Sequence, residues 1–97
     1  HPDLYMMLDV GHDFVGEGDP STTIDQLAQR IVGMNFHDND GSADAHKVPG
    51  DGCLDFHAAI RAIKKRDWFG LVVFEVRNGD FDRARQVLSS IEKEAAL

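Results

Sequence analysis

Short apolar runs alternate with amphipathic stretches along this chain. Residues 4–8, 31–36 and 71–76 are almost continuous apolar runs, which are typical of parallel strands buried on both faces. Residues 21–29, 55–66 and 81–95 instead repeat their apolar positions every three or four residues, as amphipathic helices do. The pattern therefore predicts the order β-α-β-α-β-α, an α/β fold in which right-handed crossovers join parallel strands.

Polar residues mark the segments between these elements. Thr22 and Asp25 have the spacing of a capping box at the start of the first helix. Residues 78–80, Asn-Gly-Asp, predict a turn before the last helix, while residues 11–20 and 38–54 contain the glycines, prolines and acids of loops. A loop as long as 38–54 in so small a chain is more often functional than idle.

The length of the chain matches part of a larger barrel. A complete (β/α)8 barrel takes about 250 residues, so three strand–helix units should take roughly 94. The 97 residues thus fit three-eighths of a barrel, a single partial domain over residues 1–97. Three strands leave two open edges and an uncovered inner face, so we expect a homo-oligomer formed through the open edges, or contact with missing chain. The start at His1, without a methionine, suggests a piece of a longer protein.

Composition narrows the class of protein. With 42% hydrophobic and 28% charged residues the chain is globular rather than disordered. A formal net charge of −7 argues against nucleic acid, because phosphate binding relies on Lys and Arg. No apolar run approaches the ~20 residues that cross a membrane. The single cysteine, Cys53, excludes an internal disulfide and fits a reducing cytoplasm.

Acidic, amide and imidazole side chains stand at the end of every predicted strand. They are Asp9 and His12 after the first strand, Asn35 and His37 at the end of the second, and Glu75 near the end of the third. Because the carboxyl ends of parallel strands meet at one edge, these groups should converge there. Oxygen and nitrogen donors of this kind bind divalent metals, so the pattern predicts a metal or substrate site.

Each of these residues also has a plainer interpretation. Asp9 and His12 alone would more often be a strand-ending acid and a solvated loop histidine. Asn35 shares a face with His37 by the two-residue period of a strand, and a hydrogen-bonded core amide is as good an interpretation as a ligand. Glu75 follows an apolar run in which an unpaired buried carboxylate is costly, so it needs a cation, a metal or a rim position.

The long loop contributes a second pair of donors. Asp44 and His46 are two residues apart, so their side chains can reach one ion from an extended segment. A solvated loop remains the alternative for this pair taken by itself. The placement of all these groups after successive strands, rather than any single pair, favours a functional site.

Three signatures, in this order and spacing, resemble the xylose isomerase-like TIM barrel superfamily. They are Leu8-Asp9-Val10-Gly11-His12, Phe36-His37-Asp38-Asn39-Asp40-Gly41 with Asp44-x-His46, and Val73-Phe74-Glu75-Val76. The superfamily contains sugar and sugar-phosphate isomerases and epimerases, and the metal-cluster apurinic-site endonucleases (AP endonuclease family 2). The resemblance covers essentially the whole chain, and implies the sixth to eighth strand–helix units, the C-terminal part of the barrel.

The resemblance implies a role for each matching residue at the strand ends. Asp9 and Glu75 match metal ligands, and in the isomerases Glu75 can also act as the acid/base. Asn35 stands where the superfamily usually has a metal-binding histidine, and His37 offers a substitute through a local shift. His12 matches a histidine that contacts substrate in the isomerases, or a third metal in the nucleases.

The same resemblance extends to the loop and to residues outside the chain. Asp44 and His46 match the pair that serves the third metal of the nucleases. Other ligands, including a glutamate on the fifth strand, are expected before residue 1, so the divalent-metal site (Mn, Mg, Co or Zn) is incomplete in this fragment.

These implications favour a C-terminal fragment of a divalent-metal-dependent sugar or sugar-phosphate isomerase or epimerase, inactive alone and cytoplasmic. One alternative is a fragment of a zinc-dependent apurinic-site endonuclease, which His12, Asp44 and His46 favour and the acidic charge opposes. Another is a non-catalytic barrel remnant that self-associates. The expected small-molecule partner is a sugar or sugar phosphate, and no membrane is expected.

Overall fold

The computed structural model describes residues 4–76 and 80–95. Its strands are β1 (Met6–Asp9), β2 (Ile31–Phe36) and β3 (Leu71–Phe74), which form one parallel sheet in the order β1-β2-β3. Its helices are α1 (Val10–Val15), α2 (Pro20–Leu27), α3 (Phe56–Lys65) and α4 (Phe81–Ala95), and a short 3-10 turn, η1 (Ala28–Arg30), follows α2. The predicted arrangement of three parallel strand–helix units is confirmed.

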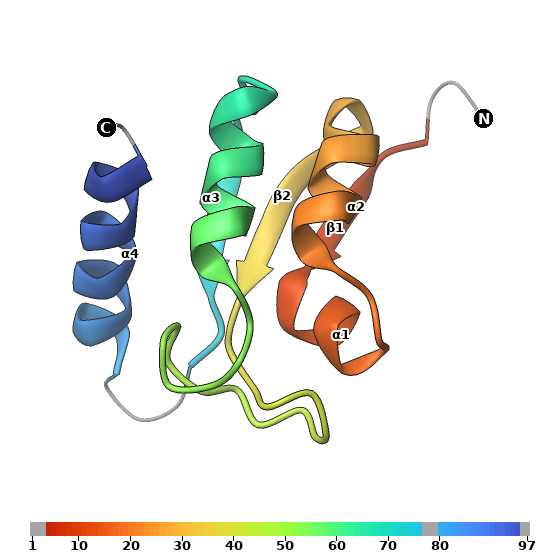
Figure 1. The fold of residues 1–97 in the computed structure, drawn as a ribbon. Coiled ribbons are helices and arrows are strands. Elements are labelled where there is room, and N and C mark those ends of the chain that lie inside the picture. Colours follow the sequence, from red (N-terminus) through yellow and green to blue (C-terminus); the bar gives the residue numbers. More distant parts are fainter. Residues whose placement is uncertain (1–3, 77–79, 96–97) are drawn as a thin grey trace.

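The helices cover one face of the sheet. Figure 1 shows α2, α3 and α4 side by side in front of the strands, with α1 and the long loop below the strand ends. Strand residues on the covered face, such as Leu8, Met34 and Phe36, are buried in a core that also includes Ile60 of α3 and Leu88 of α4. This is the arrangement expected for the outer layer of an α/β barrel, in which each helix packs against the strands that flank it.

The opposite face of the sheet is open within the described residues. Met7, Leu71 and Val73 alternate with the core residues of their strands and are 50%, 66% and 38% exposed. The strands predicted to be buried on both faces are therefore covered on one face only. The uncovered face is the one that would face the inside of the barrel expected from the sequence.

The start of α2 differs from the prediction. Asp19, rather than a capping box at Thr22 and Asp25, caps this helix by accepting hydrogen bonds from the backbone and hydroxyl groups of Ser21. These bonds and one from Thr22 lower the pKa of Asp19 below its usual value. Asp25 instead accepts a hydrogen bond from Arg66 Nε at 2.7 Å, linking α2 to the end of α3.

The predicted loop over residues 11–20 also contains structure, because α1 occupies its first half. Asp9 caps α1 by accepting a hydrogen bond from His12 N at 2.9 Å, and Gly16 ends it. The predicted turn at residues 78–80 falls mostly outside the described part of the chain. No helix within that part has the length and apolar character to cross a membrane.

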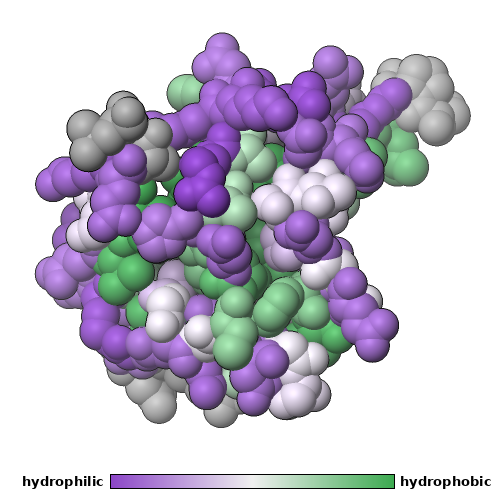
Figure 2. All heavy atoms as spheres, in the orientation of Figure 1, coloured by the Kyte–Doolittle hydropathy of each residue, from purple (hydrophilic) through white to green (hydrophobic). Residues whose placement is uncertain are grey.

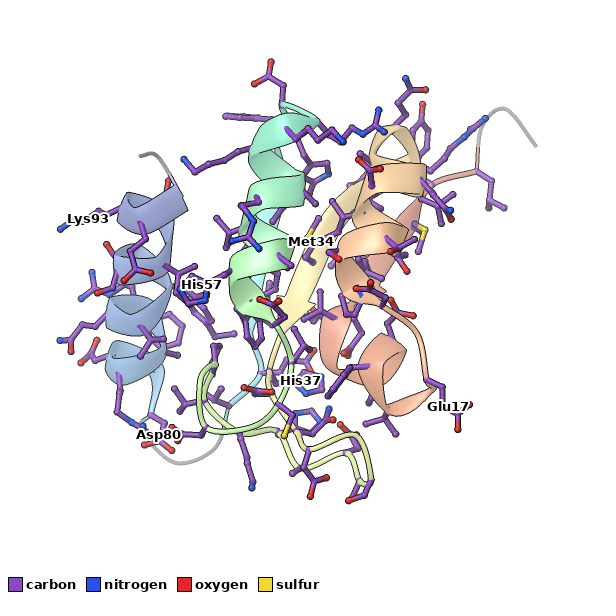
Figure 3. The ribbon with its side chains drawn as sticks, viewed as in Figure 1. Glu17, Met34, His37, His57, Asp80 and Lys93 are labelled. Atoms are coloured by element: carbon purple, nitrogen blue, oxygen red, sulfur yellow. The ribbon has the colours of Figure 1, made fainter. Side chains whose placement is uncertain are left out.

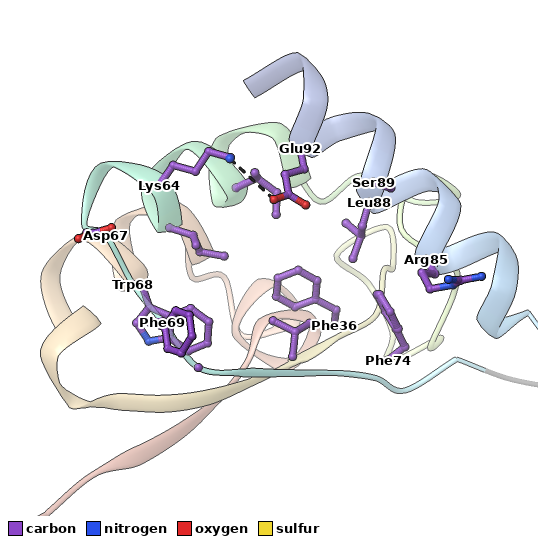
Figure 4. A pocket seen from close by; sticks show the side chains of 14 residues that line it. Phe36, Lys64, Asp67, Trp68, Phe69, Phe74, Arg85, Leu88, Ser89 and Glu92 are labelled. Atoms are coloured by element: carbon purple, nitrogen blue, oxygen red, sulfur yellow. Dashed lines mark ion pairs between the residues drawn. The ribbon is translucent and has the colours of Figure 1, made fainter. Parts of the chain in front are cut away.

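The helix-covered face combines a polar surface with apolar hollows. Figure 2 shows hydrophilic side chains over the helices and hydrophobic ones in the depressions between them. A groove of about 680 Å³ lies between α3, α4 and β3, with Trp68, Phe36 and Phe74 among the side chains along it. An ion pair from Lys64 to Glu92 spans its two helices (Figure 4). None of the predicted site residues lines this groove.

Candidate functional site

The carboxyl ends of the three strands lie at one rim, where the sequence predicted the site. Asp9 is the last residue of β1, His37 follows β2 and Glu75 follows β3. Figure 3 places His37 just beyond the end of β2, between α1 and the long loop. The strands thus deliver two carboxylates and an imidazole to the same edge.

Asp9 binds two of the neighbouring histidines. His37 Nε2 donates to Asp9 Oδ1 at 2.6 Å, and His12 Nδ1 lies 3.1 Å from the other oxygen. Asp9 also caps α1, so this short helix fixes where His12 stands above the strand end. Gly11 is required between them, because a Cβ at this position would overlap the ring of His37.

His37 is fully buried and has one nitrogen without a partner. Its Nδ1 makes no hydrogen bond among the described residues, and the nearest carboxylate oxygen, Asp44 Oδ1, is 3.7 Å away. Its ring stacks on that of His46, with centroids 4.0 Å apart and planes at 6°. Leaving a buried polar atom unsatisfied costs about 1–3 kcal/mol, so the position suits a group that binds a ligand.

The long loop brings two further donors to the rim. Asp44 Oδ2 lies 2.7 Å from His12 Nε2, and Asp44 Oδ1 lies 3.1 Å from His46 Nε2. His46 Nδ1 in turn is 2.8 Å from the backbone oxygen of Glu75. His46 has a φ of +52°, a left-handed conformation that is unfavourable for a residue with a Cβ and persists where the surroundings enforce it.

The contact between Asp44 and His12 shifts the pKa values of both side chains. The hydrogen bond to Asp44, and then the charge of Asp9, raise the pKa of His12 above its usual 6.5, against a smaller opposing effect of burial. The same hydrogen bond from His12, supported by His46, lowers the pKa of Asp44 below 3.8. His12 is largely exposed, so its charge faces whatever enters the rim.

Glu75 completes the set from the third strand. Its backbone N–H donates to Phe36 O at 3.1 Å, which continues the pairing of β2 and β3 past the assigned strand ends. Its carboxylate is about one-third exposed, with Oε2 4.0 Å from His46 Nδ1. The side chain therefore has the rim position that was one of the alternatives predicted for it.

Two overlapping groups of side chains have the spacing of a metal site. One contains Asp9, His37 and Glu75, and the other contains His12, His37, Asp44 and His46; within each group the ligand atoms lie within 4.8 Å of one another. Imidazole nitrogen and carboxylate oxygen are ligands that divalent transition metals accept. Together with the unpartnered Nδ1 of His37, this donor set fits a divalent ion.

The structure brings together six of the seven predicted site residues and leaves Asn35 in the strand. Asn35 pairs with Asp9 across the sheet and is half-buried, but the close contact with the Asp9 carboxylate comes from His37. The local shift from Asn35 to His37 is compatible with this contact, and ligand roles for Asn35 and His37 both stay predictions. Sequence reasoning included Asp38 and Asn39 in the loop signature but gave them no role, and the structure shows that their side chains are buried and hydrogen-bonded within the loop. An Asp-Asn pair directly after a strand and before a glycine-rich loop was the available signal.

Comparison with known proteins gives the same fold and a consistent group of relatives. A family model described as xylose isomerase-like TIM barrel matches residues 1–95. An inosose dehydratase from Bacillus velezensis is 27% identical over 89 residues, covering 74% of this chain and 30% of that protein. A fructoselysine 3-epimerase from Escherichia coli O157:H7 is 27% identical over 75 residues, covering 77% of this chain and 27% of that protein.

A solved structure supports the same fold. The crystal structure of a D-tagatose 3-epimerase-like protein superimposes with a TM-score of 0.89 at 23% identity, over 99% of this chain and 37% of that chain. The chain therefore corresponds to part of a barrel, and it spans less than a third of the length of the inosose dehydratase and the fructoselysine 3-epimerase.

Proposed function

Because the chain belongs to the xylose isomerase-like TIM barrel family, we propose that its strand-end cluster is part of the divalent-metal site of a sugar or sugar-phosphate isomerase or epimerase. The observation that carries the proposal is that ligand atoms of Asp9, His37 and Glu75 lie within 4.8 Å of one another, on a buried histidine whose Nδ1 has no hydrogen-bond partner among the described residues. The relatives, an inosose dehydratase and a fructoselysine 3-epimerase by name, support a sugar-like substrate.

In this proposal Asp9, His37 and Glu75 hold the ion, which supplies polarisation of the substrate oxygens when bound. In the metal-free protein Asp9 orients the imidazole of His37 through the 2.6 Å hydrogen bond to its Nε2. The stacked ring of His46 limits the rotation of His37 from the other side. These contacts keep the donors in place before a ligand arrives.

Glu75 is the candidate acid/base. Its carboxylate is partly exposed at the rim, so it can reach both bulk water and a bound sugar. Moving a proton on the carbon next to a carbonyl needs such a group within hydrogen-bond reach of that carbon. The partner carboxylate, on a strand outside these residues, would take the other face of the substrate.

His12 is the candidate substrate contact. It stands at the mouth of the rim and is more than half exposed, and its raised pKa keeps more of it protonated near neutral pH than an ordinary histidine. A protonated imidazole donates hydrogen bonds to hydroxyl, carbonyl or phosphate oxygens. This property suits both sugars and sugar phosphates.

A zinc-dependent phosphodiesterase acting on abasic DNA is the second candidate. The observation that favours it is the second group of donors, His12, Asp44 and His46, beside the first. A net charge of −7 opposes it, because DNA binding needs cationic surface to neutralise phosphates.

The two candidates are separated by ligand-induced line broadening with Mn²⁺. Mn²⁺ is paramagnetic, so protons held beside the bound ion lose their sharp NMR signals. We expect the Mn²⁺-loaded protein to broaden signals of ketoses or ketose phosphates, and Asp9→Asn to abolish the effect. Broadening of an abasic-site oligonucleotide instead would favour the nuclease, and failure to bind any divalent ion would overturn the proposal.

A further inference from the structure

Asp38, the residue after His37 and the first of the long loop, is fully buried. Its Oδ1 accepts hydrogen bonds from the backbone N–H groups of Asn39 at 2.8 Å and Leu54 at 3.0 Å. Its Oδ2 accepts from those of Gly50 at 2.9 Å and Gly52 at 3.0 Å. Burying a carboxylate is costly, and here backbone donors from both ends of the loop offset that cost.

The backbone of Asp38 fixes the segment that carries the loop ligands. Its N–H donates to Lys47 O at 2.8 Å, and its carbonyl accepts from Lys47 N at 2.9 Å. These two bonds close residues 39–46 into one excursion that begins beside His37 and ends at His46. Lys47, the residue after His46, is held to Asp38 through both its N–H and its carbonyl group. This constrains the backbone of His46, including its left-handed φ.

Asn39 joins the same excursion to α1. Its side chain is fully buried, and Nδ2 donates to Gly11 O at 3.0 Å while Oδ1 accepts from Gly41 N at 2.8 Å. Gly11 precedes His12 in α1. The hydrogen bond from Asn39 therefore ties α1, which carries His12, to the loop that carries Asp44 and His46. Neither Asp38 nor Asn39 belongs to either group of candidate ligands.

We propose that Asp38 is a positioning residue that holds the loop over residues 39–54 in the shape that presents Asp44 and His46 to the strand-end cluster. Asp38 holds the loop through the four backbone N–H groups that donate to its carboxylate and through its two backbone hydrogen bonds with Lys47. The geometric part of this proposal stands on the metal-free protein. Its consequence for metal binding rests on the proposed function.

The direct variant is Asp38→Asn. The amide keeps the size of the side chain, but its NH2 group would face two N–H donors in place of the oxygen that accepts from them. Asp40→Asn is the matched control, because it makes the same chemical change in the same loop at an exposed carboxylate that, among the described residues, accepts hydrogen bonds from Ser42.

Two readouts are measured on the full chain, with circular dichroism and urea unfolding as the check on folding. The first is the nuclear Overhauser effect between the ring protons of His37 and His46, which are stacked in the metal-free structure. The second is the affinity for Co²⁺, followed by its visible absorption. We expect Asp38→Asn to lose the ring contact and to weaken Co²⁺ binding by about 10- to 100-fold, as loss of an outer-shell partner does. Asp40→Asn should leave both unchanged.

The other possible outcomes also test the positioning role of Asp38. If Asp38→Asn keeps the ring contact and binds Co²⁺ within about twofold of the wild type, the proposal is overturned. If it does not fold, Gly52→Ala takes its place, because a Cβ there would overlap the Asn39 carbonyl oxygen and come within 2.6 Å of Asp38 Oδ1, so Gly52 must move away from the carboxylate to which its N–H donates. If the wild type binds no Co²⁺, the proposed metal site fails, and the ring contact alone decides the role of Asp38.

Discussion

The ring of His37 stacks on the ring of His46 and bonds Asp9 through Nε2, while its buried Nδ1 has no hydrogen-bond partner in the described part of the chain. In the resemblance to the superfamily, the position of the usual metal-binding histidine corresponds to Asn35, two residues before His37. Both positions point to the same side of the strand, so the choice between them depends on which lies nearer the rim. Our proposal takes His37 as the ligand, because its ring contacts the Asp9 carboxylate.

If His37 is the ligand, two alanine variants should weaken Co²⁺ binding by different amounts. His37→Ala should weaken Co²⁺ binding by more than the 10- to 100-fold that loss of an outer-shell partner costs, because a direct ligand is removed. Asn35→Ala should weaken it by less than about tenfold. Titration followed by visible absorption measures both affinities. The reverse order of effects would restore Asn35 as the ligand.

The contact between His12 and Asp44 makes the loop sensitive to pH. A histidine whose folded-state pKa is raised stabilises the folded form below its unfolded pKa, and this contribution is lost as pH rises through the folded-state pKa. An aspartate whose pKa is lowered contributes above its unfolded pKa. The contact is therefore fully effective between the ordinary values of 3.8 and 6.5, and weakens on either side.

The prediction is a titration midpoint of His12 above 6.5 in the metal-free protein. In Asp44→Asn the midpoint should fall toward 6.5, because the largest cause of the shift is removed while the smaller effect of Asp9 remains. The ring-proton NMR signal of His12 measures both midpoints. A wild-type midpoint at or below 6.5 would mean that Asp44 does not hold His12 in solution.

Among the elements, α1 is the one that sequence patterning did not anticipate. Six residues are too few for a helical period to be visible, and Gly11 and Val10 are poor helix formers. The helix forms because Asp9 caps its first turn and Val10 is fully buried in the core. Tertiary contacts therefore determine that this segment is helical. The segment lies next to the candidate site.

Gly11→Ala tests whether those contacts outweigh helix propensity. Propensity alone predicts a gain of about 1 kcal/mol in the free energy of unfolding. We expect instead a loss of about 1–3 kcal/mol, because the added Cβ would overlap the ring of His37 and the packed site must shift. Urea unfolding measures the difference. Gly16→Ala, where the nearest atom would be a backbone oxygen at 3.4 Å, is the control and should change little.

The longer elements could be predicted from the sequence because their patterns are strong. The three apolar runs and the amphipathic stripes of α3 and α4 gave the parallel α/β order, and Asp55 caps α3 by accepting from Ala58 N. The exposure of Met7 and Leu71 followed from there being only three strands. Element boundaries were less accurate, since the cap at Asp19 lies before the residues that looked like a capping box.

The candidate site was predictable in its residues but not in its geometry. Parallel strands bring their carboxyl ends to one rim, so the convergence of Asp9, Glu75 and the loop pair followed from topology. The position of the ring of His37 depends on how far the chain stays extended past Phe36, which periodicity does not determine. The role of Asp38 depends on bonds to residues 12 to 16 positions away, which no local pattern encodes.

At the scale of the whole molecule, the open face of the sheet is the main exposed apolar feature of the strands. Met7, Leu71 and Val73 are exposed there, and β1 and β3 present unpaired edges within the described chain. Uncovered apolar faces and free edges favour association with another chain or another part of a barrel.

The chain alone should therefore self-associate in a concentration-dependent manner, as analytical ultracentrifugation would show. Leu71→Lys, which places a charge on the open face, should shift the distribution toward monomer. Ser90→Lys adds the same charge at an exposed position on α4 and should not. A wild-type chain that stays monomeric at every concentration would show that the open face does not drive association.

The central claim is that carboxylates and imidazoles from three neighbouring parallel strands form one divalent-metal site. Crystals grown with Co²⁺ or Mn²⁺ and measured near the absorption edge of the metal test it most directly. We predict an anomalous difference peak in contact with Asp9, His37 and Glu75 at the rim. A peak only at a surface pair such as His57 and Glu94, or no peak at saturating metal, would contradict the account.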